Sequence, residues 1–202
     1  MKQTLVALFF LLGILFGVFN GAAAQKPVVK GPEGKLSYKI TLPKGFNPQT
    51  DRCPMVILMH GIFASKNINP TPALARGLAK AGIASIRFDF DGHGQSDGRR
   101  QDMTIEKEIA DAKAIWDFIQ TLPYVEGVGL LGHSQGGVVA SMTAGRLAAA
   151  GIAPMWCSER FKKTYADLAT LQVVEGENHT ITRHRKEVVA STVAFFKKVF
   201  GK

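Results

Sequence analysis

The stretch that decides the fold is Gly132-His133-Ser134-Gln135-Gly136. Gly-x-Ser-x-Gly is the sequence form of a nucleophile elbow, a sharp strand-to-helix turn that presents a serine hydroxyl at the end of a sheet. Small residues are needed two places before and after the serine, because the turn packs the two backbones closely together. The bare pattern arises by chance in roughly one chain in twenty of this length, so the flanking sequence must decide.

The residues on either side supply the strand and the helix that an elbow needs. Residues 127–131 form a short apolar run typical of a buried strand. Residues 137–150 are small and apolar, and they predict a buried helix that Gly151 would close as a C-cap. The order of strand, turn and helix therefore favours an elbow over a chance match within a core helix.

Residues 127–132 also match Gly-x-Gly-x-x-Gly, which is a dinucleotide-binding pattern. Here the glycines begin inside the predicted strand, and no Asp or Glu occurs from Gln135 to Ser158, where the ribose-binding acid belongs. We therefore expect no nucleotide, and no other cofactor is indicated.

Along the rest of the chain, apolar runs alternate with helical patterns. The run at residues 36–42 alternates as in an edge strand, and the glycine-rich residues 91–98 predict a turn. Strands are also predicted at 55–59, 83–90 and 171–175, and helices at 71–81, 104–122, 158–168 and 183–200. Buried strands alternating with helices predict an α/β fold, a mostly parallel sheet with helices on both faces.

Residues 1–24 have the pattern of a secretory signal peptide. Lys2 is their only charge, residues 5–19 are an apolar core, and three alanines before Gln25 form a small-residue cleavage site. The core is short for a membrane span, which needs about 20 residues, although an uncleaved anchor is the alternative. We therefore expect a secreted or periplasmic protein with one domain, residues 25–202, and no stable membrane anchor after cleavage.

The formal net charge is +9, and much of the basic excess lies near the C-terminus. The basic residues there alternate with apolar residues at helical spacing, as on a solvated helix face. No nucleic-acid-binding motif accompanies the charge, so no nucleic-acid partner is expected.

Cys53 and Cys157 are the only cysteines, and they would either pair in an oxidising compartment or remain buried thiols.

Four stretches together resemble one known family. They are the elbow with Gly137 after it, His60-Gly61-Ile62, residues 89–98, and residues 174–179, Val-Glu-Gly-Glu-Asn-His. With these motifs the chain resembles the α/β-hydrolase superfamily, and more closely its cinnamoyl and feruloyl esterase-like carboxylesterases. The resemblance covers about residues 30–150 and 154–200.

The resemblance implies a role for four residues. Ser134 would be the nucleophile and His179, which follows it in the chain as in this superfamily, would be the base. The backbone N–H groups of Ile62 and Gln135 would form the oxyanion hole. The implied substrate is a small-molecule ester, and no metal is implied.

The other polar residues near these motifs are expected to have lesser roles. His60 and His133 flank the site and would shape loops, while His93 sits in the glycine-rich turn. His184 is the runner-up for the base, although it lies at a predicted helix start. The carboxylates that follow the neighbouring strand are expected to form turns; they are Asp91, Asp97 and Asp102.

The chain departs from the family where the triad acid belongs. Relatives carry two strands, the acid loop and an inserted lid after the elbow helix. Here the elbow helix runs into residues 152–158 with almost no linker, and Pro154 onward resembles the segment just beyond the acid, as if a segment were deleted around residues 150–154. The sequence therefore predicts a shortened α/β-hydrolase fold without those two core strands, the lid or the triad acid. The only acids between nucleophile and base are Glu159, Asp167, Glu175 and Glu177, and Glu159 or Glu177 is the alternative orienter of the base.

Two functions from different classes follow. In the first, the strand at 171–175 pairs beside the elbow strand, His179 reaches Ser134, and the protein is an exported serine ester hydrolase. In the second, it is a truncated, catalytically impaired member that acts as a non-enzymatic binding protein or is a damaged gene product. A third, weaker hypothesis is that the protein is a peptidase or a thioesterase. An exposed apolar sheet edge would favour a homodimer.

Overall fold

The structure is a computed structural model, and it describes residues 27–150, 178–179 and 181–202. Several expectations therefore fall outside the described residues. They concern the signal peptide, the Gly151 cap, the helix at 158–168, the strand at 171–175, Cys157 and the four acids between nucleophile and base.

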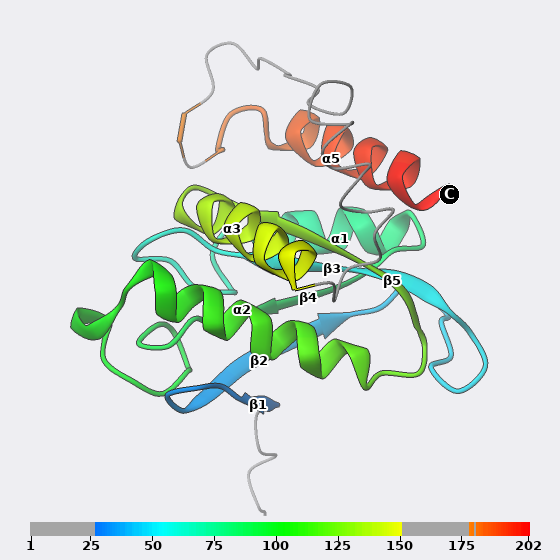
Figure 1. The fold of residues 1–202 in the computed structure, drawn as a ribbon. Coiled ribbons are helices and arrows are strands. Elements are labelled where there is room, and N and C mark those ends of the chain that lie inside the picture. Colours follow the sequence, from blue (N-terminus) through cyan, green and yellow to red (C-terminus); the bar gives the residue numbers. More distant parts are fainter. Residues whose placement is uncertain (1–26, 151–177, 180) are drawn as a thin grey trace, which may run out of the picture.

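The described strands form one five-stranded sheet in the order β1-β2-β4-β3-β5 (Figure 1). The strands are β1 (Val28–Lys30), β2 (Lys35–Thr41), β3 (Cys53–Met59), β4 (Ala84–Phe88) and β5 (Val125–Gly132). β3 runs parallel to both β4 and β5, while β1 and β2 join antiparallel at the other side. The α/β fold class is confirmed, with a sheet that is parallel in three of its five strands.

Helices cover both faces of the sheet, as expected (Figure 1). α1 (Thr71–Lys80) and α5 (Arg185–Phe200) lie on one face, and α2 (Ile105–Gln120) and α3 (Gln135–Ala149) on the other. A one-turn 3-10 helix, Arg100–Asp102, precedes α2. Within the described ranges, no helix is both long and apolar enough to cross a membrane.

β3 shows how one strand serves both faces. All seven of its residues are buried, and successive side chains of a strand point to opposite faces. Val56 and Leu58 accordingly pack with Leu78 of α1 and Phe196 of α5. Met55, Ile57 and Met59 join the core under α2 and α3, and the Cys53 thiol is buried and free at the start of the strand.

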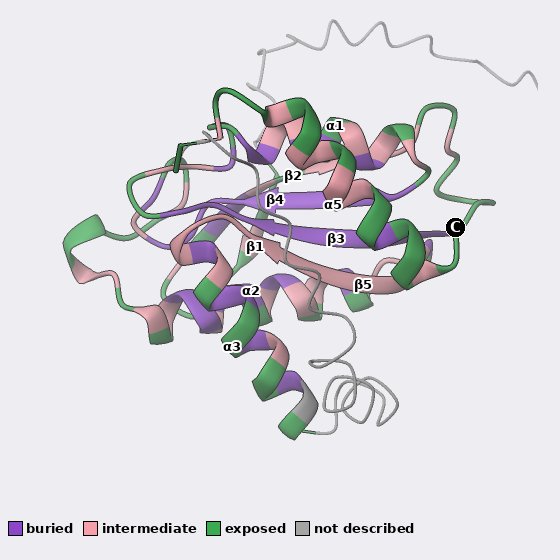
Figure 2. Cartoon of the chain, turned by 90° about the horizontal axis from the view of Figure 1, so that it is seen from above, coloured by how far each residue is buried: buried purple, intermediate pink, exposed green. Residues whose placement is uncertain are grey.

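Two expectations about burial are wrong. The strand near residue 36 is not an edge strand, because the short β1 pairs with it on its outer side. β5 and α3 are not fully buried either: Figure 2 shows β5 as intermediate, beside the buried β3 and β4. Val138 on α3 is 52% exposed. Within the described sheet, β5 is the last strand and pairs with β3.

Candidate active site

The turn between β5 and α3 has the geometry of a nucleophile elbow. Ser134 has φ +57°, a left-handed conformation that is strained for a residue with a side chain. A Cβ on Gly132 would overlap the carbonyl group of Gly136, and one on Gly136 would come within 2.5 Å of the His60 carbonyl oxygen. Only glycine fits at these two positions, so the sterics that the motif predicts are present.

The structure brings Ser134 and His179 together, although 45 residues separate them. Ser134 Oγ and His179 Nε2 are 2.7 Å apart, which is hydrogen-bonding distance for a nucleophile and its base. Ser134 is half-buried and His179 is exposed. His184, the runner-up, instead lies at the N-terminus of α5. The expected approach of His179 to Ser134 is therefore present, whereas the expected pairing of the strand at 171–175 beside the elbow strand lies outside the described residues.

The loop after β3 runs directly against the nucleophile. A Cβ on Gly61 would lie 2.9 Å from Ser134 Cβ. His60 Nδ1 donates to the Gly61 carbonyl oxygen at 2.8 Å, and His60 Nε2 accepts from the Phe90 N–H at 3.3 Å. Because a trans peptide is planar, a Gly61 carbonyl turned toward His60 points the Ile62 N–H the opposite way. His60 thus shapes this loop, as expected.

The bonding of His60 requires a neutral ring. Protonation would put a second N–H on the nitrogen that accepts from Phe90. Burial lowers the pKa of His60 to about 4, since the charged form is disfavoured in a low-dielectric site. The loop that carries Ile62 therefore keeps its shape at neutral pH.

Gln135, the second expected oxyanion donor, is held through its side chain. Its Nε2 donates to Glu108 Oε2 at 2.7 Å and approaches Met103 Sδ at 3.5 Å. Glu108 is buried on α2, and burial raises its pKa. Within the described part of the chain, no main-chain hydrogen bond from the N–H of Ile62 or of Gln135 is present. Sequence reasoning missed Glu108, although an acid on the apolar face of a predicted helix is an available signal.

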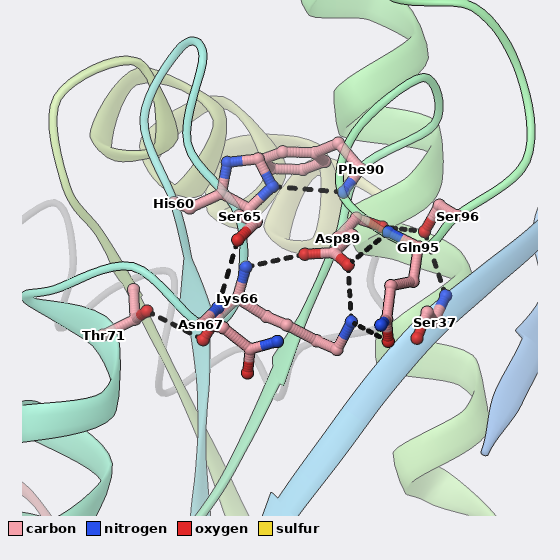
Figure 3. A network of polar contacts seen from close by, with 10 residues as sticks. All are labelled: Ser37, His60, Ser65, Lys66, Asn67, Thr71, Asp89, Phe90, Gln95 and Ser96. Carbon is pink, nitrogen blue, oxygen red and sulfur yellow. Dashed lines mark hydrogen bonds and ion pairs between the residues drawn. The ribbon is translucent and has the colours of Figure 1, made fainter. Parts of the chain in front are cut away.

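A second polar group, which we call the Asp89 cluster, follows β4; it comprises Lys66, Asp89, Gln95 and Ser96 (Figure 3). Asp89 accepts from Lys66 Nζ at 2.5 Å, from the Lys66 N–H at 2.6 Å and from the Gln95 N–H at 2.8 Å. Ser96 Oγ donates to the Asp89 carbonyl at 2.6 Å and accepts from the Ser37 N–H at 2.9 Å. The cluster ties the loops after β3 and β4 to β2.

The glycine-rich turn places Asp91 beside a second buried carboxylate, Asp111 of α2. The Asp91 N–H donates to Asp111 Oδ2 at 2.8 Å, and burial raises the pKa of Asp91 and raises that of Asp111 to about 7. His93 Nδ1 donates to the Asp91 carbonyl at 3.0 Å. Asp97 accepts from the N–H of Lys35, and Asp102 pairs with a nearby arginine. These residues form turns and loop contacts, as predicted.

The contacts of His179 include one more histidine. His133 Nε2 lies 2.6 Å from the His179 carbonyl oxygen. Among the described residues, no carboxylate hydrogen-bonds to His179. In the same part of the chain, no group of three or more His, Cys, Asp and Glu side chains is placed to hold a metal ion.

The elbow, the loop against it and the Ser–His contact agree with the comparison of the chain with known families. The model of a hydrolase family described as serine aminopeptidase, S33, matches residues 50–156, just over half of the chain. The chain belongs to this α/β-hydrolase family.

Solved structures of α/β hydrolases have the same fold. Est1E from Butyrivibrio proteoclasticus with ferulic acid bound gives a TM-score of 0.73 at 18% identity, covering 87% of this chain and 100% of that one. An α/β serine hydrolase without lid from Xanthomonas campestris gives 0.62 at 19% identity, covering 86% and 94%. At these identities the likeness establishes the fold alone. The Xanthomonas campestris structure is an example of this fold without a lid.

One curated relative is an uncharacterised 31.7 kDa protein from the traX–finO intergenic region of Escherichia coli. It is 30% identical over 111 residues, which cover 54% of this chain and 38% of that protein. The chain therefore matches well under half the length of that relative.

Proposed function

We propose that this protein is an exported serine ester hydrolase, with Ser134 as nucleophile and His179 as general base. The observation that carries the proposal is the 2.7 Å contact between Ser134 Oγ and His179 Nε2 at a strained elbow. A serine hydroxyl is a weak nucleophile until an adjacent base accepts its proton, and this contact supplies the base.

The geometry supports a two-stage reaction. Ser134 Oγ passes its proton to His179 Nε2 and attacks the ester carbonyl carbon, so the carbonyl oxygen becomes negatively charged. The N–H groups of Ile62 and Gln135 would donate to this oxygen, and such donors are worth about 3 kcal/mol each. His179 then protonates the departing alcohol, and it later activates the water that releases the acid from Ser134.

The proposed substrate class is a small ester of an aromatic acid, such as a hydroxycinnamoyl ester. Support comes from the fold likeness to Est1E, which is described with ferulic acid bound, and from apolar surface after the Gly61 loop. Phe63, two residues beyond Gly61, is 67% exposed. Export is supported by the signal-peptide pattern of residues 1–24.

A catalytically impaired binding protein is the second candidate. It is favoured by the lack of a carboxylate on His179 among the described residues, because loss of the triad acid alone lowers kcat about 10⁴-fold in serine proteases. The two candidates differ in turnover, which decides between them.

The test is hydrolysis of p-nitrophenyl acetate and of methyl ferulate by the purified protein and by Ser134→Ala. Circular dichroism and thermal melting of both proteins must first show equal folding. Turnover that disappears in Ser134→Ala supports the hydrolase. Equal, background-level rates in two folded proteins would reject it in favour of the binding protein.

A further inference from the structure

The ring of His133 connects the elbow to the turn that carries His179. Its Nε2 lies 2.6 Å from the His179 main-chain oxygen, and the two ring centres are 5.2 Å apart. A carbonyl oxygen can only accept, so Nε2 carries the proton and His133 donates. The residue before the nucleophile thus holds the main chain of the base.

His133 is itself anchored to β3, whose residues are all buried. Its N–H donates to the Met59 carbonyl of β3 at 3.0 Å, and its carbonyl accepts from the Gly136 N–H at 3.0 Å. A Cβ on Gly61 would lie 3.4 Å from His133 Nδ1, so the loop after β3 lies close to the ring. The donor is therefore fixed in place.

The turn around His179 restrains the same segment from the other side. The Asn178 carbonyl accepts from the Ile181 N–H at 3.0 Å, and Asn178 Oδ1 accepts from the Thr182 N–H at 3.2 Å. His179 lies within this turn, so rotation of its main chain would swing the imidazole away from Ser134. The hydrogen bond from His133 opposes that rotation.

We propose that His133 is the positioning residue of the base: by holding the His179 carbonyl, it keeps Nε2 within reach of Ser134 Oγ. In triads a carboxylate on Nδ1 performs this task, whereas here the contact is to the main chain. The inference rests on the proposed function. A misplacement of about 1 Å in a catalytic group costs on the order of 100-fold in rate, and this sets the expected effect.

Two amide substitutions of similar polarity test the proposal. In His133→Gln the side-chain amide nitrogen can occupy the place of Nε2, whereas the shorter amide of His133→Asn corresponds to Nδ1 and cannot reach His179. We expect kcat to fall on the order of 100-fold in His133→Asn and His133→Ala and to stay within about fivefold in His133→Gln. Thermal midpoints of all variants serve as the control for folding.

A second readout separates this inference from the proposed function. Crystal structures of the same variants measure the distance from Ser134 Oγ to His179 Nε2, which needs no turnover. We expect it to stay near 2.7 Å in His133→Gln and to exceed 3.5 Å in His133→Asn. An unchanged distance in His133→Asn, or equal kcat in the Gln and Asn variants, would overturn the positioning role. An inactive wild-type protein with the expected distances would overturn only the proposed function.

Discussion

The Asp89 cluster and the Ser134–His179 pair lie at corresponding ends of β4 and β5, the two strands that flank β3. Both depend on a short polar contact, 2.5 Å in the Lys66–Asp89 ion pair and 2.7 Å in the serine–histidine pair. The side chains of Lys66 and Asp89 are only 4% and 1% exposed, whereas His179 is open to solvent. Burial makes the first contact part of the scaffold, and exposure leaves the second available to a substrate.

Removing the base gives the largest expected effect. His179→Ala should lower kcat/KM for p-nitrophenyl acetate by about 10⁴-fold or more, because Ser134 then loses its proton acceptor. The thermal midpoint should hardly move, since His179 is exposed. His184→Ala is the matched control and should keep wild-type activity. More than 1% residual activity in His179→Ala would remove this histidine from the reaction.

Breaking the buried ion pair should act on stability. Lys66→Met leaves the Asp89 carboxylate buried and without its cation, so the free energy of unfolding should fall by about 3–5 kcal/mol in urea denaturation. Lys113→Met removes an exposed lysine paired with Asp117, and its cost should stay below about 0.5 kcal/mol. Similar losses in the two variants would show that burial does not distinguish the two kinds of contact.

Asp111 should make stability depend on pH. Its pKa is about 7 in the folded protein and about 3.9 in an unfolded chain, so the folded state binds more protons between these values. Stability therefore falls as pH rises from about 4 to about 7. Asp111→Asn stays neutral and still accepts from the Asp91 N–H.

Melting curves at pH 4 and pH 8 measure this effect. We expect Asp111→Asn to gain on the order of 4 kcal/mol over the wild type at pH 8 and almost nothing at pH 4. Asp117→Asn, on the exposed face of the same helix, should show no such pH-dependent gain. A constant difference between Asp111→Asn and the wild type across this range would refute the assignment.

The bond between Glu108 and Gln135 should have the smallest effect. Glu108→Ala should lower kcat about tenfold with little change in KM, because the oxyanion donor at Gln135 loses its support. Glu108→Gln keeps an acceptor oxygen and should restore most of the rate. Glu106→Ala, on the exposed side of α2, is the control. A drop in melting temperature without a change in kcat would limit Glu108 to a structural role.

The sequence predicts those parts of the molecule whose structure is determined by residues close to one another in the chain. The elbow follows from local sterics at Gly132 and Gly136, and β3 and β4 follow from unbroken apolar runs. β1 has only three residues and exists through its pairing with β2, so no pattern of its own predicts it.

The supports of the site depend on contacts between distant residues. Glu108 and Gln135 are 27 residues apart, and His133 and His179 are 46 apart. The family motif supplies Ser134 and His179 as candidates, but the residues that hold them are determined by how α2 and the His179 turn pack against the elbow. For this reason sequence reasoning gave His133 only a general role in loop shape.

The position of β5 has a consequence for heating. All seven residues of β3 are buried, whereas those of β5 are half-buried or exposed. Amide protons of β5 should therefore exchange with solvent through small local openings, and those of β3 only when the whole domain unfolds. Ser134 follows directly on β5. On heating, hydrolytic activity should therefore be lost several degrees below the temperature at which circular dichroism detects unfolding.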